Sequence, residues 1–549
     1  MYSINRHWCF LLCAIVVCAA LLAGCSNRRP QPQATGQRAE SEKLHDATVS
    51  PEWLTYGHDY SNRRFSPLDQ INSGNVDTLS PAYVIQTGAF GRLETTPIIS
   101  GGVMYVTTAY DGILAIDART GNRLWERPPL QGRFRLCCGP VNRGVAITDN
   151  LVIIGQIDGT LVAVDRKTGS FRWATVVADN VAGYSITMAP LVYGNSVIVG
   201  VAGSEFGIRG SLSSYSIRGG KLQWRWYSTD PHHWFGPSRR LRTDHGLSDA
   251  AKSATLRKEF ANSWEHGGGG IWTTPAIDQT TNTVYVATGN PWPDTDGSER
   301  PGDNLYTDSL VALDASTGRM KWYFQQTPHD IQDLDAASPP LLFDAVDDAG
   351  HEVPAVGEAG KTGLFYILNR DTGTLIRKVR QVVVTGGGAT LGGSTWSPVS
   401  FDAGLGYAIV SASQHLKIEN GSVRSEGAPT SLRSAGWSSG YGIVSALDVA
   451  TGAVIWEDKF DVGLVGGSAS TAGGLTFVGE ANGNFDALET KSGLRLWHFQ
   501  TGAGVNAAPA VFELDGKEYV AVASGGNQQF GTRFGDAVIV FSLEQNKGR

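Results

Sequence analysis

From Pro51 onward, short apolar runs alternate with polar positions at a period of two residues, which indicates β-strands. Residues 112–116 and 159–164 are examples, and each run leads into a turn of the form Asp-x-x-Thr-Gly-x-x-x-Trp, at 117–125 and 165–173. The Thr-Gly pair supplies a turn that needs positive φ, and the next strand then carries the Trp to a fixed depth. The pattern predicts antiparallel units, each packing a Trp on its neighbour.

Further copies of this repeat follow along the chain. A looser copy spans 216–224, the copy at 369–374 lacks the Trp, and the others span 314–322, 448–456 and 489–497. Most turn glycines are separated by about 40–55 residues, which fits one four-stranded blade of a β-propeller. Two wider gaps imply insertions, and we expect residues 225–266 and 376–390 to shape an entrance.

The repeats therefore predict an all-β, eight-bladed propeller over residues 50–549, with Trp-docked blades. Seven turns are visible, and the eighth blade is expected to form when the segment from 53–57 onwards pairs with the final strand, 537–541. Such pairing removes the open sheet edge that invites aggregation. A β-solenoid is the alternative, but antiparallel units that carry Trp argue against it.

The N-terminus is typical of an export signal. Arg6 and His7 precede the apolar run 8–22, which is too short for a comfortable membrane span and ends in small residues. We predict a signal peptide over 1–24 and a flexible tether over 25–49. The sequence Leu-Ala-Gly-Cys25 resembles the bacterial lipobox, which implies a lipid on Cys25. The next residue, Ser26, resembles outer-membrane sorting. A plain signal peptide or an N-terminal anchor is the alternative.

Composition and cysteine use agree with an exported all-β chain. Gly 68, Trp 15 and 18% charged residues suit a turn-rich protein, and the net charge of -7 without a basic block does not favour a nucleic-acid partner. Beyond the signal and Cys25, only the adjacent Cys137 and Cys138 remain. An oxidising compartment permits them to bond to each other, although two unpaired thiols are possible.

The segment Cys137-Cys138-Gly-Pro-Val-Asn-Arg143-Gly, set among Trp-docked blades, resembles the quinoprotein alcohol dehydrogenases. These are the methanol and ethanol dehydrogenase family, and the resemblance runs from about Pro51 to Leu543. It implies pyrroloquinoline quinone (PQQ) as cofactor. A disulfide between Cys137 and Cys138 would cover one face of PQQ, and Trp272, at the end of the Gly-rich segment 267–272, the other.

The same resemblance implies a metal site and a catalytic base. Glu205 and Asn290 match the family's metal-binding Glu and Asn, and Asp333, in the segment 327–335, matches the catalytic Asp. Asp335 stands two residues later, on the same side of an extended backbone. A carboxylate there resembles the lanthanide-using branch, so we expect Glu205, Asn290, Asp333 and Asp335 as ligands of a lanthanide ion, with calcium as the alternative.

The remaining cofactor contacts also follow from the resemblance. The residues expected to bind PQQ, besides the two cysteines and Trp272, are Glu94, Arg143, Lys361, Thr395 and Trp396. Lys361 would lie beside the quinone oxygen and assist catalysis. The chain departs from the family's pattern at five positions, which puts two or three cofactor contacts in doubt: Gly155, Ala202, Gln332, Thr395 and Val465.

These residues together predict oxidation of an alcohol by hydride transfer to PQQ, with Asp333 as general base. The family passes electrons to a c-type cytochrome, and because the chain has no Cys-x-x-Cys-His motif, we expect a separate cytochrome c as partner. The expected location is the periplasmic face of the outer membrane. Two alternatives stay open: a non-catalytic lipoprotein scaffold resembling the β-barrel assembly propeller, and a PQQ enzyme for a sugar or polyol.

Overall fold

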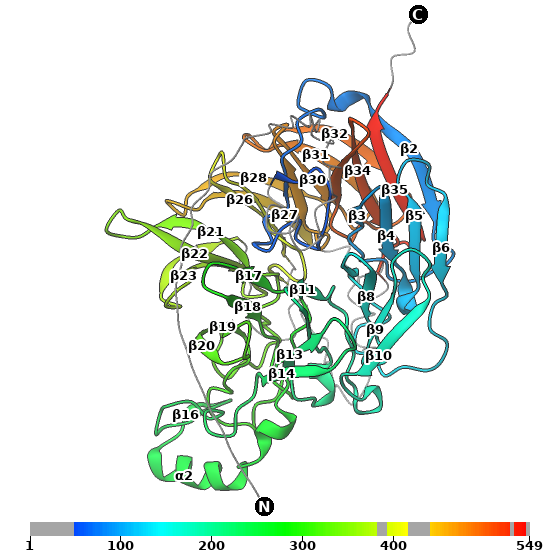
Figure 1. Cartoon of the computed structure of the whole chain (residues 1–549). Coiled ribbons are helices and arrows are strands. Elements are labelled where there is room, and N and C mark those ends of the chain that lie inside the picture. Colours follow the sequence, from blue (N-terminus) through cyan, green and yellow to red (C-terminus); the bar gives the residue numbers. More distant parts are fainter. Residues whose placement is uncertain (1–48, 382–391, 415–439, 528–531, 545–549) are drawn as a thin grey trace, which may run out of the picture. The chain divides into compact units, whose positions relative to one another are not determined.

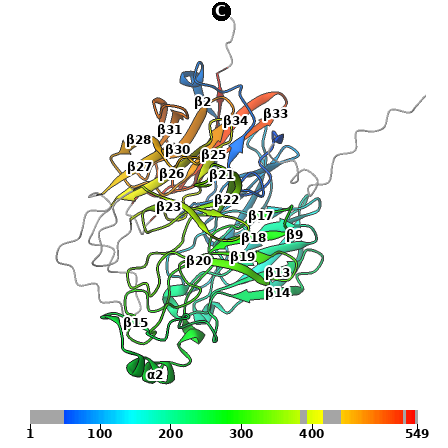
Figure 2. The same cartoon turned by 90° about the vertical axis from the view of Figure 1, so that its left-hand side faces the viewer.

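The computed structural model describes residues 49–381, 392–414, 440–527 and 532–544. In this part of the chain, eight sheets form the blades of a propeller, each built on four antiparallel strands, which confirms the predicted fold class (Figures 1 and 2). We number the blades in chain order from the sheet that starts at β3. The predicted signal peptide, Cys25 and most of the tether lie outside the described residues.

In blades 1 to 7 the four antiparallel strands run in order along the sequence. Blade 1 holds β3 (Ile98–Ser100), β4 (Val103–Thr107), β5 (Ile113–Asp117) and β6 (Arg123–Arg127); blade 2 holds β7 (Ala146–Ile147), β8 (Leu151–Gly155), β9 (Thr160–Asp165) and β10 (Phe171–Val176); blade 3 holds β11 (Leu191–Tyr193), β12 (Ser196–Gly200), β13 (Ser211–Ser216) and β14 (Leu222–Tyr227); blade 4 holds β17 (Ala276–Asp278), β18 (Thr283–Ala287), β19 (Ser309–Asp314) and β20 (Met320–Gln325).

The second half continues this order. Blade 5 holds β21 (Leu341–Val346), β22 (Glu352–Ala359), β23 (Leu364–Asn369) and β24 (Leu375–Arg380); blade 6 holds β25 (Ser400–Asp402), β26 (Tyr407–Gln414), β27 (Tyr441–Asp448) and β28 (Val454–Phe460); blade 7 holds β29 (Ser468–Thr471), β30 (Leu475–Gly479), β31 (Asn484–Glu489) and β32 (Arg495–Gln500), with β1 (Phe65–Ser66) added parallel to β29; blade 8 holds β33 (Ala510–Leu514), β34 (Lys517–Ser524), β35 (Ala537–Leu543) and β2 (Leu79–Gln86).

The repeated Trp docks blades 1 to 4, 6 and 7 onto the next blade, as the pattern predicts. The indole Nε1 of Trp125 donates to the carbonyl of Arg166 in blade 2 at 3.0 Å, and that of Trp173 donates to Ile217 in blade 3 at 2.9 Å. The ring also covers the turn glycine of the next blade: a Cβ on Gly169 would lie 2.6 Å from Trp125. Together with its positive φ, this contact explains why the repeat requires glycine at that position.

Blade 8 closes the ring with strands from both ends of the chain. β35 pairs antiparallel with β2 over Leu79–Gln86, and Figure 1 shows red β35 beside blue β2. We expected the segment from 53–57 onwards to pair with the final strand. The structure shows that the pairing begins later, at Leu79 in β2, so the predicted start of the closing strand is wrong. Trp53 is fully buried and bridges Ile99 of blade 1 instead, so the closing strand begins further along the chain.

The insertion after blade 3 carries the one α-helix of the described residues. It contains β15 (Arg242–Thr243), β16 (Gly246–Leu247) and α2 (Ala250–Glu259), which begins where the Asp249 side chain caps Lys252 N. Short 3-10 turns span Val76–Thr78 (η2), Ala109–Asp111 (η3), Asn180–Ala182 (η4), Ser204–Phe206 (η5) and Ser263–His266 (η6). Of the helices in the described residues, none is long and apolar enough to cross a membrane.

Candidate functional site

The candidate site residues fall into two classes of loop. Some lie just before the first strand of a blade, such as Arg143 before β7, Trp272 before β17 and Asp335 before β21. Others follow the second strand, such as Glu205 after β12 and Asn290 after β18. In an antiparallel hairpin the first strand starts at the edge where the second ends. Both classes of loop therefore lie at one end of the blades, which is why distant residues converge.

Glu94 and Arg143 form a buried ion pair between two indoles. Arg143 Nη2 lies 2.9 Å from Glu94 Oε2, and both side chains are almost fully buried. The Arg143 Cζ atom lies 5.3 Å from the ring centres of both Trp272 and Trp396. Its Nη1 also donates to the Trp272 carbonyl at 3.3 Å. The structure thus brings together four of the residues that the sequence assigns to the cofactor.

Several buried polar atoms beside this pair lack a hydrogen-bond partner in the described structure. They are Arg143 Nε, Thr395 Oγ1 and Asn506 Oδ1. An unsatisfied buried polar atom costs about 1–3 kcal/mol, so such atoms in one place point to a polar ligand. The flat PQQ ring system carries carboxylates that could accept from Arg143 Nε and Thr395 Oγ1, and a ring N–H that could donate to an amide oxygen such as Asn506 Oδ1.

Two side chains that contact Arg143 and Glu94 were not predicted from the sequence as site residues. Asn527 Nδ2 donates to Glu94 Oε1 at 2.9 Å, and Thr187 Oγ1 accepts from Arg143 Nη1 at 3.1 Å. Asn527 follows β34 of blade 8 and Thr187 precedes β11 of blade 3, and neither residue stands in a sequence motif that marks it as part of a site. A sequence signal for Asn527 is the preceding Gly525-Gly526, since Gly pairs at the end of a strand permit close approach of backbone.

Cys137, Cys138 and Glu205 gather on another side of the site. Their ligand atoms lie within 4.8 Å of one another, and the two sulfur atoms are 2.7 Å apart. Both thiols are free in the structure, so the predicted disulfide remains a prediction. Glu205 is accessible to water, yet desolvation is the main cause that raises its pKa. The charge of Asp335 raises this pKa further.

Lys361 forms ion pairs with the two aspartates of the segment 327–335. Its Nζ lies 2.9 Å from Asp333 Oδ1 and 2.5 Å from Asp335 Oδ2. Asp335 Oδ1 in turn accepts from the backbone N of Asn290 at 2.5 Å. Gly289 links this cluster to the indole, because a Cβ there would lie 2.7 Å from Asp335 Oδ1 and 3.1 Å from Trp272 Nε1. Both aspartates therefore contact one ammonium group, but Asp333 has a positive φ of 60°, so the predicted extended i, i+2 backbone is wrong at this residue.

The charges of this cluster perturb one another. Burial raises the pKa of Asp333 well above its ordinary value, and the Lys361 ammonium opposes that rise. Desolvation lowers the pKa of Lys361, but the two aspartates outweigh it and keep that pKa well above its ordinary value. A carboxylate beside a fixed ammonium in a buried site is the arrangement expected of a proton acceptor.

Two of the positions that depart from the family pattern are explained by packing. A Cβ on Gly155 would lie 2.2 Å from Ile186 Cγ2, so no hydroxyl side chain fits there. Val465 is 1% exposed and packs with Trp272 and Trp396, filling space that a larger ring would take. Ala202 is buried and its backbone pairs with Ser185. These residues shape the walls around the indoles and donate no side-chain hydrogen bonds.

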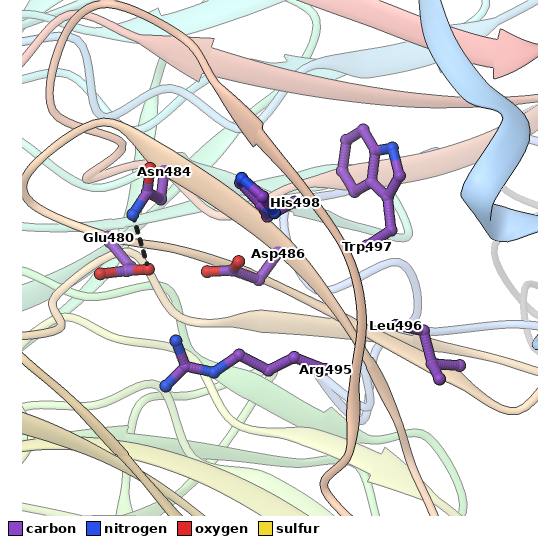
Figure 3. A pocket seen from close by; sticks show the side chains of 7 residues that line it. All are labelled: Glu480, Asn484, Asp486, Arg495, Leu496, Trp497 and His498. Carbon is purple, nitrogen blue, oxygen red and sulfur yellow. Dashed lines mark hydrogen bonds between the residues drawn. The ribbon is translucent and has the colours of Figure 1, made fainter.

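A polar pocket of about 330 Å³ lies on blade 7 and contains none of the predicted site residues (Figure 3). The carboxyl groups of Glu480 and Asp486 face each other there, and Asn484 Nδ2 donates to Glu480 Oε1 at 3.2 Å. Arg495 is paired with Asp458 of blade 6 at 2.6 Å. Burial and the hydrogen bond with Glu480 raise the pKa of Asp486 to about 8. We interpret this pocket as a structural contact between blades.

The raised pKa of Asp486 predicts a pH dependence of stability. Between about pH 4 and pH 8 the folded state holds a proton that the unfolded state releases, so stability falls as pH rises, by up to about 1.4 kcal/mol per pH unit. Replacing Asp486 with Asn (D486N) removes this titration and keeps a hydrogen-bond donor. Calorimetry at pH 5 and pH 8 should show a smaller drop in Tm for D486N than for the natural protein. Equal drops would contradict the prediction.

Comparisons with known proteins identify the family. The profile described as glucose/ethanol/alcohol dehydrogenase, beta-propeller domain, matches residues 53–390, and one described as outer membrane protein assembly factor BamB matches residues 440–545. The chain is 33% identical to quinoprotein alcohol dehydrogenase PedH of Pseudomonas putida, over 93% of this chain and 91% of that protein. It is 32% identical to a quinoprotein ethanol dehydrogenase of Pseudomonas aeruginosa, over 88% and 87%.

Solved structures give the same result. Quinohemoprotein alcohol dehydrogenase from Comamonas testosteroni matches with a TM-score of 0.78 and 30% identity, over 93% of this chain and 83% of that chain. A europium-containing methanol dehydrogenase matches with a TM-score of 0.76 and 26% identity, over 91% and 100%. Fold, site geometry and relatives agree, and the chain belongs to the family of PQQ-dependent quinoprotein alcohol dehydrogenases.

Proposed function

We propose that this PQQ-dependent alcohol dehydrogenase holds its quinone between the Cys137–Cys138 pair and Trp272, over a metal ion. The observation that carries the proposal is the Glu94–Arg143 pair between two indoles, next to the cluster of Lys361 with two aspartates. An Arg fork suits a carboxylate of the cofactor, and an indole suits the face of a flat ring. Thr395 and Trp396 complete the wall beside Arg143.

The proposed ligands of the metal ion are Glu205, Asn290, Asp333 and Asp335. A carboxylate-rich set of oxygen donors suits a hard cation. Asn290 Oδ1 is free to turn inward, since only its Nδ2 makes a side-chain hydrogen bond, to Pro291 O at 3.0 Å. Three carboxylates favour a highly charged ion, so we propose a lanthanide rather than calcium. The europium-containing methanol dehydrogenase among the similar structures supports this choice.

Asp333 and Lys361 have different proposed roles in alcohol oxidation. PQQ, when bound over the metal ion, supplies the acceptor for the hydride. Asp333 accepts the proton of the substrate hydroxyl at a carboxylate oxygen, which its partly exposed side chain leaves within reach of a substrate. Lys361 holds Asp333 in place through its 2.9 Å contact and stabilises negative charge that develops nearby.

We further propose that the protein is exported and works with a separate partner. Cleavage before Cys25 and acylation of its thiol would hold the enzyme at the periplasmic face of the outer membrane. A separate cytochrome c would take the electrons one at a time. The N-terminal pattern and the absence of a Cys-x-x-Cys-His motif in the sequence support these proposals.

The proposal predicts that quinone binding depends on Trp272. Replacement by Ala (W272A) removes one stacking face and should weaken PQQ binding about 10–100-fold, whereas W272F should retain most of it. Affinity is measured by titrating purified protein with PQQ in the presence of calcium or lanthanum and following Trp quenching. Dye-linked assays over an alcohol and sugar panel then define the substrate. Failure to bind PQQ with either metal would refute the proposal and favour a scaffold role.

A further inference from the structure

Asp308 is a fully buried carboxylate that the roles above do not use. It lies directly before β19, at the end of the loop that leads back from the candidate site, and its side chain is 0% exposed. Neither carboxylate oxygen has a hydrogen-bond partner among the described residues. The nearby Thr307 hydroxyl donates elsewhere, to Asn304 O at 2.9 Å. A buried carboxylate without a donor is costly unless a positive charge compensates it.

The Arg300 guanidinium lowers the pKa of Asp308 through its charge but donates no hydrogen bond to it. The N–H groups of Arg300 donate hydrogen bonds to other acceptors. Nη1 donates to Asn304 Oδ1 at 2.8 Å, and Nε and Nη2 donate to Pro293 O at 3.0 and 2.7 Å. The other charged neighbours, Asp330 and Asp335, are carboxylates, and together with burial they raise the pKa of Asp308. Burial and the two neighbouring carboxylates therefore favour the protonated form of Asp308 unless a further cation lies nearby, since Arg300 opposes them only in part.

The backbone places Asp308 directly behind two proposed metal ligands. Asp308 N donates to Gly289 O at 3.1 Å, and the next residue, Asn290, donates its N to Asp335 Oδ1. Glu358, also fully buried, offers a contrast, because it accepts from Gln326 Nε2 and from Ser338 N at 3.2 Å. Asp308 has no such donors, so a cation held by Asn290 and Asp335 is the compensating charge that its position allows.

We propose that Asp308 is a specificity-determining residue: a carboxylate that does not ligate the metal but adds negative charge behind Asn290 and Asp335, and so favours a trivalent over a divalent ion. This inference rests on the metal site under the proposed function. Coulomb energy scales with the charge of the ion, so the effect of one fixed carboxylate on a trivalent ion is one and a half times that on a divalent ion. Preference between ions is thereby set outside the ligand shell.

The test replaces Asp308 with Asn (D308N), which keeps the shape and removes the charge. Terbium luminescence in the purified, metal-free protein measures the affinity for Tb³⁺, and competition measures that for Ca²⁺. We expect affinity to fall about 30-fold for Tb³⁺ and about 10-fold for Ca²⁺. The reason is that the logarithms of these two fold-changes should stand in the same ratio as the charges of the two ions. The preference for Tb³⁺ then falls about threefold.

Matched variants separate this inference from the metal site itself. D486N removes an equally buried carboxyl group with an unpartnered oxygen in blade 7 and should leave both affinities unchanged. D308S serves if D308N does not fold, with Tm as the check. The inference is overturned if the Asp308 variant binds both ions with unchanged affinity, or if its affinity falls by the same factor for both. In either case, loss of Tb³⁺ binding in D335N would still support the metal site. A natural protein that binds neither ion overturns both.

Discussion

Replacement of Asp333 by Asn (D333N) is expected to lower kcat by about 10²–10⁴-fold, which is the usual contribution of a general base. Asn has nearly the shape of Asp but cannot accept the substrate proton. Asp333 also has a positive φ of 60°, a conformation that Asn tolerates well, so the backbone of the loop should be retained. Because Asp333 is also a proposed metal ligand, the comparison is made at saturating metal ion, where the variant should fold and bind PQQ with an affinity close to that of the natural protein.

The measurement is a dye-linked assay of the reconstituted enzyme at several alcohol concentrations, together with a PQQ titration. D348N is the matched control, because the Asp348 side chain is 93% exposed, and it should leave kcat unchanged. An active D333N enzyme would remove Asp333 from the mechanism. Loss of PQQ binding in D333N would instead assign this residue a structural role.

The fold was largely predictable because its repeats are local. The Thr-Gly turn and the Trp that follows it lie within nine residues of each other, and each is needed for contact with the next blade. The closing strand was harder to predict. β2 carries no repeat turn, and its Tyr83 takes the position over the Gly121 turn that a Trp occupies in other blades. Nothing in the sequence around Trp53 distinguishes a closing strand from a buried bridge.

The convergence of the candidate residues was predictable where they form motifs and unpredictable where they do not. Cys137, Arg143 and Asp333 stand in recognisable segments, and the structure brings their surroundings together. Asn527 and Asp308 are single polar residues at the ends of strands, where sequence alone cannot distinguish a buried partner from a solvated turn. Which side chains they contact depends on which loops lie next to each other. The sequence does not give this arrangement, because it is set only when the blades close into a ring.

Replacement of Asp335 by Asn (D335N) is expected to weaken Tb³⁺ binding by about 100-fold or more, because it removes a carboxylate charge from the proposed ligand set. The change keeps an oxygen that can accept from Asn290 N, so the local backbone should persist. Lys361 loses one of its two carboxylates and remains paired with Asp333. Luminescence titration provides the affinity, and lanthanide-dependent turnover should fall with it. Calcium binding should fall less, because the attraction lost scales with the charge of the ion. Retention of Tb³⁺ affinity in D335N, with D486N as control, would exclude Asp335 as a ligand and with it the argument for a lanthanide ion.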